Sequence, residues 1–285
     1  MRTIASWSVS DLGLGGMPMS IKGRPSEAES IAVIHAALDG GMTLIDTADV
    51  YCIDDDDIGH NERLIAKALK GRREQVVVAT KGGLERPKGA WVTNGHPGHL
   101  RRACERSLAA LEVDRIDVYQ LHAPDDQVSL ADSVGALARL REEGKIAHVG
   151  LSNVTVAEID QARAIVPIVS VQNRCGPLDT SPWEDGVLAH CTQLGITFLA
   201  YSPVNGSRGK GQIAREADLV AIGRQYGVSP FQVALAWLLG KSPVMLPIPG
   251  ASKLTSATDS AAAMRLTLTP ADMRRLDKKF LGTAA

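Results

Sequence analysis

The sequence predicts an α/β fold, a (β/α)8 TIM barrel with a short N-terminal β-hairpin and a C-terminal helical segment. Runs rich in β-branched residues alternate about eight times with longer runs whose apolar residues lie three and four positions apart, which is the pattern of a parallel sheet with helical crossovers. Each strand and helix together take roughly 35 residues, and eight such units favour closure into a barrel of ~250 residues plus additions. No linker or shift in composition divides the 285 residues, so we expect one domain over residues 1–285.

The elements follow one another in a regular order. A hairpin is expected around Thr3–Leu12, and a polar helical run begins at Pro270 within the C-terminal segment Leu266–Ala285. The expected strands are Leu12–Gly15, Thr43–Asp46, Gln75–Thr80, Ile116–Leu121, Ala147–Leu151, Ile168–Gln172, Thr197–Ala200 and Val244–Pro247. The expected helices are Ser26–Asp39, Asn61–Lys70, His99–Leu111, Leu130–Glu143, Val156–Ile165, Trp183–Leu194, Leu219–Tyr226 continuing through Pro230–Leu239, and Ser256–Met264.

Capping signals support these boundaries. Ser26 is followed three residues later by Glu29, which is the spacing of a capping box at a helix N-terminus. Glycines stand directly after several helical runs, where a left-handed residue is favoured. These glycines are Gly40, Gly41, Gly71, Gly144, Gly195 and Gly240.

Charge and hydropathy restrict the class of partner. The 31 basic and 32 acidic residues give a net charge of −1, so we expect a small-molecule partner and neither nucleic acid nor a membrane surface. Met1–Gly16 lacks the apolar core of a signal peptide, and the strongly apolar stretch Val233–Leu239 is far shorter than the ~20 residues that cross a bilayer. Four cysteines without CxxC spacing predict neither a zinc site nor disulfides, and a cytoplasmic location is expected. Nothing in the sequence predicts an oligomeric state.

Polar side chains follow the ends of several expected strands. Asp46 ends the second strand and Tyr51 comes shortly after it, Lys81 follows the third, and His122 follows the fourth. Catalytic residues of barrels gather where the strands end, so we expect these side chains to converge on one face. The other polar residues at strand ends are Thr47, Ser152, Asn153, Gln172, Asn173, Tyr201 and Ser202.

The residue types Asp46, Tyr51, Lys81 and His122 suit proton donation. A tyrosine titrates near ~10, so as a general acid at neutral pH it needs a nearby cation to stabilise its phenolate. Lys81 can supply that cation, and Asp46 would hold Lys81 in place and keep it charged. His122 would donate a hydrogen bond to a substrate oxygen or help pass the proton. Alone, Asp46 could be an N-cap and His122 a core histidine; the interpretation depends on their occurring together.

Two loop segments are candidates for ligand contact. The run Leu12–Gly16 lacks the GxGxxG spacing, because Pro18 stands where a third glycine would, and its glycines are expected to let backbone approach a ligand closely. Gly16, which ends this run, and Met17, which follows it, are candidate cofactor contacts. The segment Pro247–Lys253 leads into the last helix, where a barrel commonly binds phosphate.

Two further loops carry weaker signals. Trp91 and Asn94 lie in a long polar loop that suits the lining of a substrate pocket, with plain solvent exposure as the competing interpretation. The acidic run Asp54 to Asp57 is expected to be a solvated loop tip, and no metal site is predicted, because no further ligands recur at fixed spacing.

The motifs at these positions are similar to those of the aldo-keto reductase superfamily over essentially the whole chain. The resemblance implies a (β/α)8 barrel that reduces carbonyls with a nicotinamide cofactor, usually NADPH, without a metal and without a Rossmann domain. The motifs are Leu44-Ile45-Asp46-Thr47-Ala48 with Tyr51, Gly59-His60-Asn61-Glu62, Ala79-Thr80-Lys81, Asp114-Arg115-Ile116-Asp117 leading to His122, Gly144-Lys145-Ile146 with Gly150-Leu151-Ser152-Asn153, Val171-Gln172-Asn173, and Ala200-Tyr201-Ser202-Pro203.

The resemblance also implies individual roles. Tyr51 would be the general acid, Lys81 and Asp46 its tuning pair, and His122 the residue that orients the substrate. The implied cofactor contacts are the nicotinamide carboxamide for Ser152, Asn153 and Gln172, the nicotinamide ring for Tyr201, the pyrophosphate for Ser202, Val204 and Gly206, and the adenosine 2′-phosphate for Ser252 and Lys253. The last helix departs from the family pattern, with Ser256, Asp259 and Ser260 where many members have an Arg followed by Glu-Asn, so NADH stays possible.

The leading hypothesis is reduction of a small aldehyde or ketone by NADPH, or the reverse oxidation of an alcohol. Two alternatives stay open. In one, the barrel is a lyase or aldolase in which Lys81 forms a Schiff base, although an aldolase needs a neutral lysine and Asp46 would keep Lys81 charged. In the other, it is a weakly active subunit that binds cofactor to sense redox state, although the intact set of proton-donating residues argues against this.

Overall fold

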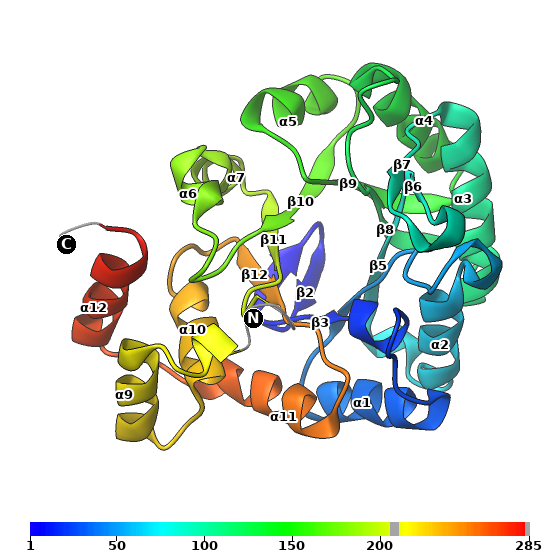
Figure 1. Ribbon diagram of the computed structural model, residues 1–285. Helices are drawn as coiled ribbons and strands as arrows, with labels where there is room; N and C mark the ends of the chain where they lie inside the picture. Colours follow the sequence, from blue (N-terminus) through cyan, green and yellow to red (C-terminus); the bar gives the residue numbers. More distant parts are fainter. Residues whose placement is uncertain (206–210, 283–285) are drawn as a thin grey trace.

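Eight parallel strands form the centre of the molecule in a computed structural model that describes residues 1–205 and 211–282 (Figure 1). Neighbours pair in the order β3-β4-β5-β8-β9-β10-β11-β12. Gly15 forms a parallel bridge to Gly250, and the Gly13 and Gly15 N–H groups donate to the carbonyls of Pro247 and Pro249, each at 3.0 Å. The first and last strands therefore meet, and the predicted barrel is confirmed. The strands are β3 (Leu14–Gly15), β4 (Leu44–Asp46), β5 (Val77–Gly82), β8 (Ile116–Leu121), β9 (Ile146–Ser152), β10 (Ile168–Arg174), β11 (Thr197–Tyr201) and β12 (Met245–Ile248).

Helices return the chain outside the strands, and Figure 1 shows them surrounding the barrel. The expected helix over Trp183–Leu194 is broken at Gly186, and the helical run through Leu219–Leu239 is broken at Gly227, because both glycines are left-handed, with φ of 80° and 68°. The helices are α1 (Glu27–Asp39), α2 (His60–Ala68), α3 (Pro97–Leu111), α4 (Leu130–Glu142), α5 (Val156–Arg163), α6 (Ser181–Glu184), α7 (Val187–Leu194), α9 (Ala217–Tyr226), α10 (Pro230–Leu239), α11 (Leu254–Ala262) and α12 (Pro270–Phe280), with 3-10 turns η1 (Met17–Met19), η2 (Asp55–Asp57), η3 (Arg73–Gln75), η4 (Pro87–Gly89) and η5 (Ala263–Arg265).

The N-terminal hairpin closes one end of the barrel. Strands β1 (Arg2–Ile4) and β2 (Trp7–Val9) pair antiparallel, as the sequence predicts. Ile4 and Val9 are fully buried in one apolar cluster with side chains of β4, β5, β8, β11 and β12. The hairpin therefore fills the N-terminal end of the barrel, and ligands are left the end where the strands finish.

A second hairpin lies at that opposite end. Strands β6 (Leu84–Glu85) and β7 (Val92–Thr93) pair antiparallel within the segment expected to be a polar loop. The turn between them, η4, has left-handed residues at Lys88 and Gly89. The hairpin gives the segment a fixed shape, so its side chains can contribute to a site.

The helix caps follow the predictions in part. Ser26 accepts from the Glu29 N–H, and the Glu29 carboxylate accepts from the Ser26 N–H at 2.9 Å, so the capping box is confirmed. Gly40 and Gly240 are right-handed, with φ of −75° and −77°, so a left-handed role for them is wrong. Added Cβ atoms there would meet side chains of α11 and α12 at 2.5 and 2.6 Å, so close packing explains these two glycines. The glycines with the predicted left-handed backbone are Gly41, Gly71, Gly144 and Gly195.

Helix lengths bear on the membrane prediction. Within residues 1–205 and 211–282, no helix is both long and apolar enough to cross a membrane.

Candidate active site

The strand ends bring Asp46, Tyr51 and Lys81 together in the barrel. Asp46 is the last residue of β4, Lys81 lies near the end of β5, and Tyr51 follows β4 in a tight loop held by its N–H bond to the Ala48 carbonyl. Lys81 is 0% exposed and Asp46 is 2% exposed. A buried lysine needs partners for its charge, and β4 and β5 are adjacent strands that place these partners beside it.

The Lys81 ammonium uses all three of its hydrogens. Nζ donates to Asp46 Oδ2 at 2.7 Å, to the Thr47 carbonyl at 2.8 Å and to Tyr51 Oη at 3.0 Å. Because Tyr51 Oη accepts this hydrogen bond, its own proton is free to be donated elsewhere. The arrangement is the one that the residue types predict.

Amides hold the second oxygen of Asp46. Gln172 Nε2 donates to Asp46 Oδ1 at 2.6 Å, and Gln120 Nε2 lies 3.3 Å from the same oxygen. Gln172, in β10, was expected to meet a cofactor, and here its amide nitrogen contacts Asp46. Gln120 is missed by the sequence reasoning. Gln120 is in β8, two residues before His122, which directly follows the strand. The two-residue period of a strand could have placed both side chains on the inner face.

Burial and charge set the protonation states. Burial by itself would lower the pKa of Lys81, but Asp46 and Tyr51 outweigh it and the pKa is raised. Burial raises the pKa of Tyr51, and the Lys81 charge offsets only part of this rise. At neutral pH the site therefore holds a charged lysine beside a protonated tyrosine, which is the state that a general acid requires.

His122 faces Tyr51 from the end of β8. Its N–H donates to the Gly82 carbonyl and its own carbonyl accepts from Asn153 Nδ2, both at 2.9 Å. Burial, and then the Lys81 charge, lowers the pKa of His122 well below its ordinary value, so the imidazole is neutral. Its ring centroid lies 5.9 Å from that of Tyr51. A neutral imidazole can orient a substrate oxygen by a hydrogen bond without repelling the lysine.

The β6–β7 hairpin places Trp91 over this pair. The Trp91 ring lies 6.5 Å from the Tyr51 ring and 6.4 Å from the His122 ring, and its side chain is 48% exposed. Trp91 is therefore in position to line a substrate pocket. Asn94 points elsewhere, because its amide donates to Glu85 Oε1 at 2.9 Å, and its substrate contact stays a prediction.

A cleft runs beside Tyr51 towards the last strands. Tyr201 Oη donates to Asn153 Oδ1 at 2.9 Å, and Asn153 Nδ2 donates to Ser152 Oγ at 3.1 Å. Asn153 and Ser202 have left-handed backbones, with φ of 58° and 53°, a strain typical of functional sites. The cleft is lined by Gly15, Met17, Pro18, Asp46, Tyr51, Tyr201, Ser202, Pro203, Val204, Ile248 and Gly250.

Other candidate contacts stand near the lining residues of this cleft in the sequence, Gly16 between Gly15 and Met17, and Ser252 and Lys253 shortly after Gly250. A Cβ on Gly16 would meet Asn61 Oδ1 at 2.3 Å, so packing within the protein already requires glycine there. Lys253 is exposed and is the N-cap residue of α11, directly after Ser252. Gly206 lies outside the described residues. The contacts proposed for these residues stay predictions.

Two acidic features have partners within the protein. In the 54–57 run, Asp57 pairs with Arg24, and Asp54 accepts from the Asp56 N–H as the cap of η2. Asp259, at a position where the sequence departs from the family pattern, accepts from Ser229 Oγ at 2.7 Å and ties α11 to α10. Among the described residues, no three His, Cys, Asp or Glu side chains are arranged to hold a metal ion.

Comparison with known proteins agrees with this geometry. A model described as the Aldo/keto reductase family matches residues 11–280. The chain belongs to the aldo/keto reductase family. The reductase is therefore an NAD(P)H-dependent oxidoreductase whose general chemistry is the reduction of carbonyl groups.

Solved structures of similar proteins share the whole barrel. A thermostable aldo-keto reductase in complex with the inhibitor epalrestat is 28% identical, with 98% of each chain covered and a TM-score of 0.83. An aldo-keto reductase from Klebsiella pneumoniae in complex with NADPH is 26% identical, covering 98% of this chain and 95% of that one, with a TM-score of 0.82. The glycerol dehydrogenase of Gluconobacter oxydans is 25% identical, covering 99% and 96%, with a TM-score of 0.83.

Proposed function

We propose that this reductase converts a small aldehyde or ketone to the alcohol with NADPH, using Tyr51 as the general acid. The observation that carries the proposal is the buried chain from Asp46 through Lys81 to Tyr51, with contacts of 2.7 and 3.0 Å. It leaves the tyrosine proton free and supplies the cation that stabilises the phenolate after the proton is given.

The cleft has the features that such a cofactor needs. Tyr201 offers an aromatic ring on one wall, near the Asn153 and Ser152 side chains. Shortly after Gly250 of the cleft, the α11 N-terminus has no side-chain cap among the described residues and no acidic residue in its first turn, and Lys253 adds a positive charge. A helix N-terminus without a side-chain cap, together with a lysine, suits the 2′-phosphate of NADPH. Bound NADPH would supply the hydride.

The chain's own residues then act on the substrate oxygen. Tyr51 and neutral His122 hold the carbonyl oxygen, and Tyr51 gives it a proton as the alcohol forms. Lys81 stays charged throughout and stabilises the phenolate. Trp91 packs over the substrate beside both rings. The protein therefore accelerates the reaction by orienting the substrate with these groups and by donating a proton to its oxygen.

The Schiff-base alternative is not favoured. A nucleophilic amine must be neutral and reachable, whereas Lys81 is 0% exposed, its pKa is raised, and its three hydrogens are all engaged. The complete set Asp46, Tyr51, Lys81 and His122 likewise gives no support to a weakly active subunit that senses redox state.

The test is a panel of aldehydes and ketones assayed with NADPH and with NADH, followed by loss of reduced-nicotinamide absorbance. Tyr51→Phe should lower kcat by roughly 100-fold or more, because it removes the donated proton, while the Kd for NADPH changes little. Normal turnover of Tyr51→Phe would rule out the proposed mechanism.

A further inference from the structure

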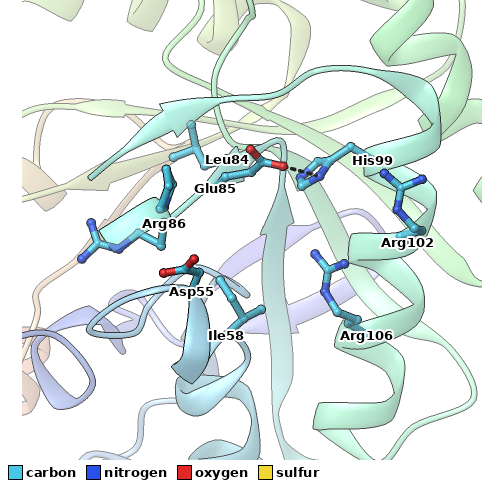
Figure 2. Close-up of a pocket in the computed structure, with 9 residues that line it drawn as sticks. Asp55, Ile58, Leu84, Glu85, Arg86, His99, Arg102 and Arg106 are labelled. Atoms are coloured by element: carbon cyan, nitrogen blue, oxygen red, sulfur yellow. Dashed lines mark ion pairs between the residues drawn. The ribbon is translucent and has the colours of Figure 1, made fainter. Parts of the chain in front are cut away.

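A second cavity, of about 460 Å³, lies outside the active site, between α3, the β6–β7 hairpin and the loop of η2 (Figure 2). Its polar lining residues are Asp55, Glu85, Arg86, His99, Arg102 and Arg106. Ile58, Leu84 and Pro87 add an apolar wall. Among the described residues, none lines both this cavity and the cleft beside Tyr51.

The cations of this cavity are poorly neutralised by the protein. Within the described residues, Arg86 and Arg102 have no carboxylate partner, and Arg106 has only Asp49, with Arg106 Nη2 3.6 Å from Oδ2. Burial, and then the charge of Glu62, raises the pKa of Asp49 to about 8, so at neutral pH this partner carries little charge. Among the described residues, Arg102 therefore borders the cavity without a carboxylate partner, and Arg106 has one carboxylate at 3.6 Å. Both arginine side chains are exposed to solvent.

The two carboxylates of the cavity have other partners. Glu85 Oε1 faces His99 Nδ1 at 3.3 Å and accepts from the Asn94 amide, and Asp55 Oδ1 accepts from the Lys88 N–H at 3.0 Å. Figure 2 shows Arg102, Arg106 and His99 on one side of the cavity and Asp55 on the other. Arg102 and Arg106 therefore face Asp55 across the cavity, while Glu85 lies beside His99.

Buried nitrogen atoms without partners lie in this lining. Arg86 is 6% exposed, and its Nε and Nη1 atoms have no hydrogen-bond acceptor among the described residues. His99 is 5% exposed, and its Nε2 atom also has no partner within them. Buried polar atoms are rarely left unpaired, so we expect a hydrogen-bond acceptor from a bound molecule next to these nitrogen atoms.

We propose that this cavity binds the oxyanion group of a small metabolite, such as a phosphate ester, on the side formed by Arg102, Arg106 and His99. Arginine forks match the geometry of phosphate oxygens, and the apolar wall leaves room for an organic body. Arg86 also lies 3.9 Å over the Trp91 ring, so the occupant is separated from the active site by these two side chains.

The experiment uses the full chain and inorganic phosphate as the probe. Thermal unfolding is followed against phosphate concentration at constant ionic strength set with chloride, in one series with the protein saturated with NADP+ and in a second series without NADP+. Wild-type protein should show a saturable rise in Tm. Arg102→Gln should weaken the apparent phosphate affinity by about tenfold, because it removes a charge-assisted hydrogen bond.

The matched control is Arg101→Gln, the neighbouring exposed arginine of α3, which pairs with Glu143 and does not line the cavity. It should keep the wild-type phosphate affinity. Absence of a saturable rise, equal weakening in both variants, or a rise seen only without NADP+ would overturn the proposal, the last by assigning phosphate to the cofactor cleft. The readout is binding, so the outcome does not depend on whether carbonyl reduction is demonstrated.

Discussion

Asp49 is a buried acid outside the active site, and its surroundings disfavour the ionised form of its carboxyl group. It is 0% exposed, and neither of its side-chain oxygens has a hydrogen-bond partner among the described residues. Burial, then repulsion from Glu62, raises its pKa to about 8, and Arg106 offsets only part of this. The carboxyl is therefore protonated in the folded protein at a pH where it is ionised in the unfolded chain.

The linkage predicts how Asp49→Asn changes stability with pH. Between the ordinary pKa of 3.8 and about 8 the folded state binds more protons at Asp49 than the unfolded chain does, so this contribution to stability is lost as pH rises. Asparagine keeps the shape and cannot ionise. The Tm of Asp49→Asn minus that of wild type should therefore increase from about pH 5 to about pH 8.

Thermal unfolding across that range measures this difference, with Asp39→Asn on the surface as the control. A Tm difference that stays constant with pH would show that the pKa of Asp49 is the same in the folded and unfolded states, and would contradict the prediction.

The side chains proposed to be catalytic could be located from the sequence, because each ends or directly follows a strand, or stands in the loop after it. The contacts of Asp46 could not. Gln120 reaches it because β8 pairs with β5 in a register that places Gln120 opposite Lys81, and register is a property of the paired strands. Arg86 was missed because an arginine in a polar loop carries no sign that it will be buried over Trp91.

At the scale of elements, α11 is the helix that we propose to influence cofactor choice. Within the described part of the chain, its N-terminal N–H groups have no side-chain acceptor, Lys253 is its N-cap residue, and Asp259 accepts a hydrogen bond from Ser229. The helix therefore has one charged side chain at its start with which to recognise a 2′-phosphate.

Lys253→Ala should consequently weaken NADPH more than NADH. Loss of one charge-assisted contact predicts a rise of about tenfold in the Kd for NADPH, and a change below about twofold for NADH, which lacks the phosphate. Cofactor fluorescence titration gives both constants. Lys278→Ala, an exposed lysine of α12, is the control and should leave both unchanged. Equal weakening of the two cofactors would show that Lys253 does not contact the phosphate.

Most barrel strands and helices lie close to their predicted ranges, since their periodic patterns are long. Two features could not be foreseen. The strands β6 and β7 have two residues each, too few for a pattern, and their pairing depends on the turn at Lys88 and Gly89. The break between α6 and α7 depends on a left-handed Gly186 inside an otherwise helical pattern.

Closure of the whole barrel depends on two segments more than 200 positions apart. The Gly13–Gly15 backbone pairs with Pro247–Gly250, and this contact decides between a closed barrel and an open sheet. The number of strands and the helical crossovers predicted a closed barrel, but they did not predict which residues make the contact that closes it. The close approach itself requires the absence of a side chain, because a Cβ on Gly15 would meet the Ile248 carbonyl oxygen at 2.9 Å and the Gly250 Cα at 3.3 Å.

Gly15→Ala should therefore destabilise the reductase, although a Gly→Ala exchange normally stabilises a protein by reducing the conformational entropy of the unfolded chain. The added methyl group presses on backbone that cannot move away, and overpacking of this kind costs about 1–3 kcal/mol. Gly135→Ala is the matched comparison, because its nearest neighbour is the end of the Arg139 side chain at 3.7 Å within α4, and there the exchange should stabilise by about 0.5–1 kcal/mol. Urea unfolding of both variants measures the two signs. If Gly15→Ala were as stable as Gly135→Ala, contact between the first and last strands would not limit the stability of the barrel.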